Sequence, residues 1–198
     1  MTGRAAIVAV ALLGATGCAS FGGRSRAFDE RRLDPAAGWI VAAPTPAVLQ
    51  EGPKDCGAAA LAMVAGRWQV PLSLEGATRA LDGAAAAPPG HPSDGARLGD
   101  LRDVARANGL KAFAVTGDRD TLVHELRAGR PLIIGLLVST SPGRARSHYE
   151  VMVAVHPEDE RYVTIDPARG WRVRGWPDLD AEWLPAGRPA MVVTGTTR

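Results

Sequence analysis

The hydrophobic pattern of this chain changes near Pro131, from the period of helices to the period of β-strands. Before that point apolar residues mostly recur every three or four positions, and after it they alternate or form short continuous runs. The expected helices cover residues 56–68, 72–83, 98–110 and 118–130, and the expected strands cover 111–115, 131–139, 148–155, 161–167, 171–176 and 190–195. Helices followed by a set of strands, rather than an alternation of the two, are typical of an α+β fold with an antiparallel sheet.

Residues 1–17 have the pattern of a secretory signal peptide. Arg4 precedes an apolar run from Ala5 to Ala15, and small residues lead up to Cys18. The run is too short for a permanent transmembrane helix, which needs ~20 apolar residues. The sequence "ATGC" that ends at Cys18 resembles the lipobox of bacterial lipoproteins, although Ala15 stands where that motif usually has leucine. In that motif the cysteine is lipidated and becomes the new N-terminus. The alternative is an ordinary signal peptide with an incidental cysteine.

We therefore divide the chain into a signal peptide at 1–17, a lipid-anchored tether at 18–38 and a single domain at 39–198. The tether region is charged, contains glycine and shows no sustained apolar period, whereas the remainder is long enough to bury a core. A lipid on Cys18 implies the bacterial cell envelope. Ala19, in place of an aspartate after the lipidated cysteine, implies the outer membrane facing the periplasm if the host is Gram-negative.

Composition excludes several classes of function. The chain has 23 Lys and Arg against 21 Asp and Glu and no long basic run, so we expect no nucleic-acid partner. It has no G-x-x-x-x-G-K-[ST] phosphate loop, and hence no ATP-binding module is expected. No CxxC, HExxH or clustered carboxylate motif points to a metal site, and we expect no cofactor.

The stretch "LQEGPKDCGAAALAM" at 49–63 contains the second cysteine of the chain, Cys56. An exported protein that keeps a cysteine unpaired is a candidate for a reactive thiol, and Cys18 is no suitable disulfide partner. Asp55 is a good helix N-cap, which would place Cys56 at the first helical position, where the helix dipole favours a thiolate. Gly57 would leave room for a substrate chain. The alternative is that Cys56 is a small apolar residue buried at the start of a helix.

A thiolate nucleophile needs a base, and the chain has four histidines. His148 begins one expected strand and Asp166 ends the next. The start of one strand lies beside the end of the next in an antiparallel hairpin, so we expect His148 and Asp166 to be neighbours, with the aspartate orienting the imidazole. The alternative for Asp166 is an ordinary turn acid before a proline. The remaining histidines, which are expected at the surface or in a turn, are His91, His124 and His156.

Gln50 with "DCGAAALAM", followed by "HYEVMVAV" and "DPARG", resembles the three motif blocks of the double-glycine leader peptidases that process bacteriocins. These are papain-like cysteine peptidases, often found as the N-terminal domain of peptide-exporting ATP transporters. The resemblance covers roughly residues 46–170 and is closer still to the stand-alone lipoprotein members of the group. It implies a papain-like α+β fold in which N-terminal helices pack on a C-terminal antiparallel sheet.

By this resemblance Cys56 is the nucleophile, His148 the general base, Asp166 the residue that orients the imidazole, and Gln50 the side-chain donor of the oxyanion hole. The implied function is hydrolysis of peptide bonds in a peptide or protein substrate, with leader peptides cut after small residues as one option. Two alternatives stay open. One is a non-hydrolytic peptide-binding module on the same fold, which the complete residue set argues against. The other is a thiol acyl-transfer enzyme, such as a deamidase or a transglutaminase-like crosslinker, which uses the same residues.

Overall fold

The computed structural model describes residues 24–84 and 95–195. The expected signal peptide at 1–17, the lipidation candidate Cys18 and His91 lie outside the described residues. Within the two described ranges, no helix combines the length and the apolar composition that crossing a bilayer requires.

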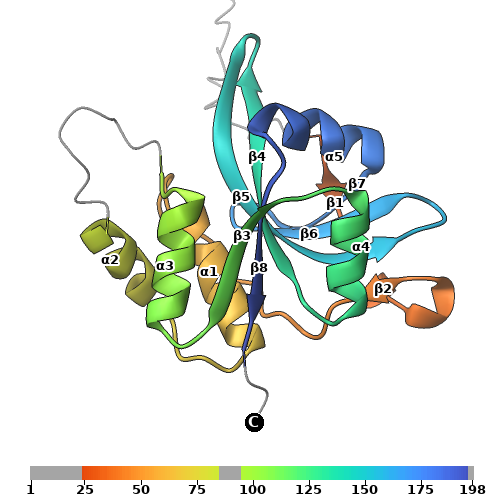
Figure 1. Ribbon diagram of the computed structural model, residues 1–198. Coiled ribbons are helices and arrows are strands. Elements are labelled where there is room, and N and C mark those ends of the chain that lie inside the picture. Colours follow the sequence, from red (N-terminus) through yellow and green to blue (C-terminus); the bar gives the residue numbers. More distant parts are fainter. Residues whose placement is uncertain (1–23, 85–94, 196–198) are drawn as a thin grey trace, which may run out of the picture.

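An antiparallel sheet forms the centre of the domain (Figure 1). Its strands follow the order β1–β7–β6–β5–β4–β8–β3, and β2 pairs with β5. The strands are β1 (Arg26–Ala27), β2 (Ile40–Val41), β3 (Lys111–Thr116), β4 (Leu132–Ser141), β5 (Arg144–His156), β6 (Arg161–Asp166), β7 (Gly170–Gly175) and β8 (Pro189–Thr194). Strands β4 to β7 are consecutive in sequence and adjacent in the sheet, so they form a meander joined by short turns. The expected α+β class is confirmed.

Helices cover both faces of the sheet (Figure 1). The first face carries α1 (Cys56–Arg67), α2 (Leu74–Ala84) and α3 (Leu98–Ala107), and the second carries α4 (Arg119–Arg127) and α5 (Trp176–Trp183). On β4, Ile133 belongs to the first core and Leu132 and Ile134 to the second, as the alternation of side chains along a strand requires. The expected packing of N-terminal helices on the sheet is confirmed for α1 to α3, whereas α4 covers the opposite face.

Helix α1 is buried from Cys56 through Ala65, because the sheet lies on one side of it and α2 and α3 on the other. Five of its twelve residues are alanine and two are glycine, and small residues allow neighbouring elements to approach closely. A Cβ atom added at Gly66 would lie 2.6 Å from the Pro46 ring, which shows how closely the preceding segment packs. The N-terminal end of α1, where Cys56 lies, is therefore held by packing along the whole helix.

A capping residue or a glycine marks one end of three of the helices. Ser73 Oγ accepts a hydrogen bond from the backbone N–H of Gly76 at 3.1 Å at the start of α2. Gly109 and Gly129, with φ of 84° and 71°, follow α3 and α4 in the left-handed conformation that glycine tolerates. Helix α5 was not expected, since eight residues are too few to establish a helical period.

The β4–β5 hairpin is longer than expected. The sequence predicted strands that stop at 139 and restart at 148, but β4 continues to Ser141 and β5 begins at Arg144. Val138 pairs with Arg146 and Ser139 with Ala145 in this outer part of the hairpin. Its residues from 139 to 147 are nearly all exposed, so a search for buried alternation could not identify them as strand.

Residues 24–38 fold against the domain, and the tether expected at 18–38 is therefore too long at its C-terminal end. Strand β1 pairs with β7, and the backbone N–H of Phe28 donates to the carbonyl of Trp171 at 3.0 Å. The rings of Phe28 and Trp39 meet edge to face with centroids 5.7 Å apart. Asp29 and Asp34 cap two short 3-10 turns, Glu30–Arg32 and Pro35–Ala37. A segment that is held by capped turns and backbone pairing needs no periodic apolar residues. Its sequence therefore resembled that of a flexible tether.

Candidate active site

Cys56 is the first residue of α1, its side chain is 7% exposed, and it is not in a disulfide. Asp55 stands at the N-cap position as expected, but its side chain makes no capping hydrogen bond to the helix. Its carboxylate instead accepts the backbone N–H of Gly52 at 2.7 Å and so closes the turn before the helix. The first-turn N–H groups of α1 therefore stay available to the sulfur, and that of Gly57 donates to it.

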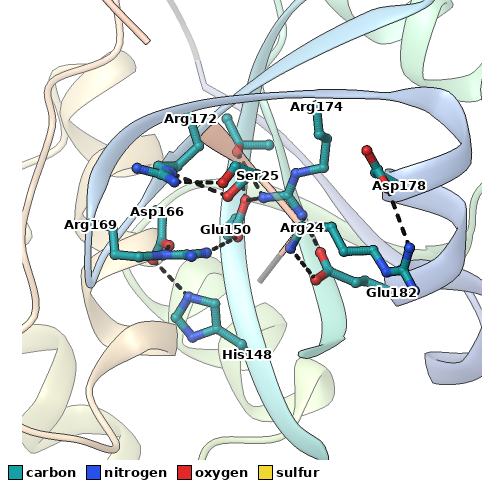
Figure 2. Close-up of polar contacts among 11 residues, drawn as sticks. Arg24, Ser25, His148, Glu150, Asp166, Arg169, Arg172, Arg174, Asp178 and Glu182 are labelled. Atoms are coloured by element: carbon teal, nitrogen blue, oxygen red, sulfur yellow. Dashed lines mark hydrogen bonds and ion pairs between the residues drawn. The ribbon is translucent and has the colours of Figure 1, made fainter. Parts of the chain in front are cut away.

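His148 and Asp166 lie side by side, as the sequence predicted. His148 is in β5 and Asp166 ends β6, and His148 Nε2 lies 2.8 Å from Asp166 Oδ1 (Figure 2). The pairing of Val151 with Ile165 sets the register that brings the two side chains together. Both side chains are almost completely buried. Nε2 is taken by the carboxylate, which leaves Nδ1 for the hydrogen bond that joins His148 to Cys56.

The protonation of Cys56 and His148 is set by their mutual contact. Burial by itself would raise the pKa of the thiol, but the hydrogen bond and positive charge of His148, with the backbone N–H groups of Tyr149 and Gly57, hold it below its usual value. Burial would likewise lower the pKa of the imidazole, but its hydrogen bonds to Asp166 and Cys56 raise that pKa to about 10. The arrangement favours a thiolate beside an imidazolium at neutral pH.

Asp166 is ionised in this environment. Burial would raise the pKa of its carboxyl group, but the hydrogen bond and charge of His148, together with Arg169 and the backbone N–H of Ala168, lower that pKa to about 2. Arg169 Nε donates to Asp166 Oδ2 at 2.5 Å, and Ala168 N donates to Oδ1 at 2.8 Å. Both carboxylate oxygens are therefore fixed, and Oδ1 is held toward the imidazole.

Gln50 lies next to this group but points its amide into its own loop. Its backbone N–H donates to the carbonyl of Pro167 at 2.9 Å, which joins the loop before α1 to the turn after Asp166. Its side-chain Nε2 donates to the carbonyl of Gly52 at 2.8 Å, and its Oε1 is buried without a hydrogen-bond partner among the described residues. The structure thus brings Cys56, His148 and Asp166 together, whereas the Gln50 amide is engaged by Gly52.

Gly57 has a different role from the expected one. We expected it to leave room for a substrate chain, but a Cβ atom there would lie 3.2 Å from Leu101 and 3.4 Å from both Ala96 and Tyr149. The absent side chain therefore makes room for α3 and β5 to pack against the first turn of α1. This packing supports the position of Cys56.

Sequence reasoning missed a buried charged cluster behind His148 and Asp166 (Figure 2). Glu150, interpreted as a strand residue, is fully buried and is ion-paired with Arg174. Arg174 Nη1 also donates to Glu182 Oε2 at 2.7 Å. A signal was present in the sequence, since Glu150 is an acid in an otherwise apolar strand and Arg174 belongs to a strand with alternating arginines. An acid and a base at such positions indicate a buried pair.

Ligand atoms of His148, Glu150 and Asp166 lie within 4.8 Å of one another, a spacing that a metal ion could use. However, Arg174 and Arg169 are ion-paired with the two carboxylates and would repel a cation at this point. The His148 imidazole and the Asp166 carboxylate are already hydrogen-bonded to each other. The geometry fits a charge network better than a metal centre.

The contacts of the other two described histidines, His156 and His124, are with residues other than Cys56. His156 Nε2 donates to the carbonyl of Ala37 at 2.8 Å and its Nδ1 accepts from the backbone of Asp159 at 3.2 Å, so it fixes the N-terminal segment. His124 is exposed on α4, as expected, and its Nε2 lies 3.8 Å from Oε1 of the neighbouring Glu125.

Solved structures share this fold. A double-glycine motif protease from an AMS/PCAT transporter, in complex with the leader peptide, superposes with a TM-score of 0.59 at 21% identity over 79% of this chain and 95% of that one. The peptidase domain of Streptococcus ComA, a bifunctional ABC transporter, superposes with a TM-score of 0.58 at 18% identity, over 75% of this chain and 97% of that one. A C39-like peptidase from Bacillus anthracis superposes with a TM-score of 0.59 at 15% identity, over 81% of this chain and 99% of that one. No curated protein sequence matches the chain.

The sequence itself matches a family profile, described as the peptidase C39 family, over residues 45–186. This range includes the loop before α1, the five strands from β3 to β7 in chain order and all of the residues of the site described above. The match covers more than two thirds of the chain. The protein therefore belongs to the peptidase C39 family and is a cysteine peptidase.

Proposed function

We propose that Cys56, His148 and Asp166 form a catalytic triad that hydrolyses peptide bonds, with Gln50 as a donor to the oxyanion. The observation that carries this proposal is the continuous chain of contacts from thiol to imidazole to carboxylate, with 2.8 Å between His148 Nε2 and Asp166 Oδ1. The same contacts lower the pKa of the thiol, and a thiolate is the nucleophilic form of cysteine.

In this mechanism the Cys56 thiolate attacks the carbonyl carbon of the scissile peptide bond, and a C–S bond forms as the carbonyl becomes an oxyanion. The His148 imidazolium then gives its proton to the leaving nitrogen, the C–N bond breaks, and a thioester remains on Cys56. Neutral His148 next accepts a proton from water, which attacks the thioester and releases the acid with regeneration of the thiolate. Asp166 holds the imidazole in orientation throughout.

The oxyanion needs at least two N–H donors. The backbone N–H of Cys56 supplies one at the start of α1, where the helix dipole also favours negative charge. Gln50 supplies the second: a side-chain amide has two N–H groups, and only one is used in the contact with the Gly52 carbonyl. That contact would orient the amide for its second donation.

For the substrate we propose peptides with a leader that is cut after small residues. Support comes from the fold shared with a double-glycine motif protease that was solved with a leader peptide. We further propose that Cys18 is lipidated after removal of residues 1–17 and anchors the enzyme in the bacterial envelope, at the outer membrane if the host is Gram-negative. The lipobox-like "ATGC" sequence supports this anchor.

The test uses purified domain and synthetic peptides with two glycines, or with two bulky residues, before the expected cleavage site. Wild type should cleave the first set, Cys56→Ala and His148→Ala should each abolish cleavage, and the double variant should lose little more, because the two residues act as one unit. A labelled primary amine is added in parallel. Amine incorporation without cleavage would identify an acyl-transfer enzyme, and tight peptide binding without either reaction would identify a binding module. Cleavage that persists in Cys56→Ala would reject the triad.

A further inference from the structure

Glu150 lies two residues from His148 on β5, and the mechanism above makes no use of it. Its side chain is 0% exposed. A buried carboxylate is unfavourable unless it is paired and hydrogen-bonded. The Oε2 atom of Glu150 meets both conditions, since it accepts from Thr164 Oγ1 at 2.5 Å and from the guanidinium of Arg174, whereas Oε1 makes no hydrogen bond among the described residues. Its Oε1 lies 3.8 Å from Arg169 Nη2.

Arg169 joins Glu150 to the site. The same guanidinium that lies against Glu150 donates from its Nε to Asp166 Oδ2 at 2.5 Å, and Asp166 in turn holds His148 (Figure 2). The far end of the cluster is closed by Glu182, which neutralises Arg174. Positive and negative groups therefore alternate without a break in the order His148, Asp166, Arg169, Glu150, Arg174 and Glu182.

The groups that face His148 come from several elements. Cys56 faces it from α1, Asp166 from β6 and Glu150 from its own strand. Arg169, from the turn after β6, lies behind Asp166 and opposes a positive charge on the imidazole. Glu150 has an oxygen within 4.8 Å of a His148 ring nitrogen, a range in which an opposite charge changes a pKa by about one to three units.

We infer that Glu150 is a positioning residue of the active site, which holds Arg169 against Asp166 and supplies a second negative charge beside the imidazole. The inference rests on the roles proposed above for Cys56, His148 and Asp166. The charge of Glu150 is among the influences that raise the pKa of His148 against the effect of burial. Without it, the positive charges of Arg169 and Arg174 would oppose the imidazolium with less compensation.

The experiment is an NMR titration of the imidazole in protein labelled with ¹⁵N-histidine, in which the His148 signal is assigned by its absence from His148→Gln. In folded Glu150→Gln the pKa of His148 should fall by about one unit, the lower end of the usual range, because the arginines partly neutralise Glu150 in the wild type. Glu150→Asp keeps the negative charge but moves it away from the imidazole by the length of one methylene. The pKa of His148 should therefore fall by less in this variant.

Glu125→Gln is the matched control. Glu125 is another largely buried carboxylate with an arginine partner, Arg130 at 2.5 Å, but it lies on α4 away from the imidazole. Glu125→Gln should also lose stability, by less than Glu150→Gln because its ion pair is partly exposed, and should leave the pKa of His148 unchanged. A purely structural role of Glu150 predicts lower melting temperatures with an unchanged His148 pKa, and that result would overturn the inference. If Glu150→Gln does not fold, an unchanged pKa in Glu150→Asp would overturn it.

This test is separate from the proposed function because the titration uses no substrate. The kinetic companion is the pH dependence of kcat/KM for a cleaved peptide, whose alkaline limb reports loss of the imidazolium. That limb should move to lower pH by the same amount in Glu150→Gln. A shifted titration in a protein that cleaves no peptide would reject the peptidase mechanism while retaining the electrostatic role of Glu150.

Discussion

Replacement of Gln50 by alanine separates catalysis from stability more cleanly than any other change in the site. In the native loop the Gln50 amide makes one hydrogen bond, to the Gly52 carbonyl, and its Oε1 is buried without a partner in the described chain. Loss of one neutral hydrogen bond costs about 0.5–1.5 kcal/mol, and relief of one unsatisfied buried oxygen returns about 1–3 kcal/mol. The Gly52 carbonyl also keeps the backbone N–H of Asp55, at 3.3 Å.

The free energy of unfolding of Gln50→Ala should therefore lie between about 0.5 kcal/mol below and about 2.5 kcal/mol above that of wild type. Turnover should change far more, because removal of one oxyanion donor typically lowers kcat by ~10²–10³. The Cys56 thiolate should be largely unaffected, since the main influences on its pKa and on that of His148 come from other residues.

Three measurements on one preparation check this reasoning: urea unfolding, the rate of iodoacetamide alkylation at pH 6, and kcat on a cleaved glycine-containing peptide. Glu51→Ala, at the exposed neighbouring position, is the matched control and should match wild type in all three. Gln50→Ala that cleaves as fast as wild type would refute the oxyanion role. A loss of stability of several kcal/mol would show instead that Gln50 holds the loop.

The remaining predictions concern single positions. Cys56 should react with iodoacetamide at pH 6 faster than free cysteine, and His148→Ala should remove this advantage; a thiol that reacts only in denaturant would contradict the lowered pKa. Since the folded pKa of Asp166, about 2, lies below its ordinary 3.8, its contribution of about 2 kcal/mol is present above pH 4 and lost as pH falls toward 2. Asp166→Asn should flatten that part of the acid unfolding curve, and an unchanged curve would count against the ion pair. Gly52→Ala should lower stability by about 0.5–1.5 kcal/mol, because the Asp55 carboxylate, 2.8 Å from the added Cβ, would have to shift and give up its hydrogen bond with the Gly52 N–H, whereas Gly99→Ala, with open space around it, should not. Wild type expressed with its N-terminus should partition into detergent and Cys18→Ser should not; an unmodified N-terminus by mass spectrometry would reject the lipid anchor.

Much of the fold was accessible from the sequence because its signals are local. The helical period that begins at Leu98, together with Asn108 and Gly109 at its end, identifies α3 within a few residues. The same holds for α1, α2 and α4 and for the apolar strands of the meander. Helix α5 was missed because eight residues are too few to establish a period. The outer part of the β4–β5 hairpin and the capped turns of residues 24–38 were missed because they have no buried period.

The pairing of His148 with Asp166 was also predictable, since the two residues are 18 positions apart on consecutive antiparallel strands. Chain topology brings such positions together before any packing is known. The position of Gln50 was only half predictable. Its loop does approach Asp166, through the carbonyl of Pro167, but the direction of its amide depends on where the Gly52 carbonyl points.

The sequence by itself determined the order of elements, the nucleophile candidate at a helix start and the hairpin that joins imidazole to carboxylate, because all of these depend on neighbours along the chain. Only the tertiary structure decided the environment of that site. Glu150, Arg174 and Glu182 come from two strands and a helix, and nothing in their spacing requires them to meet. Their charges interact across the sheet at distances set by packing, and those distances determine the electrostatic environment in which the imidazole ionises.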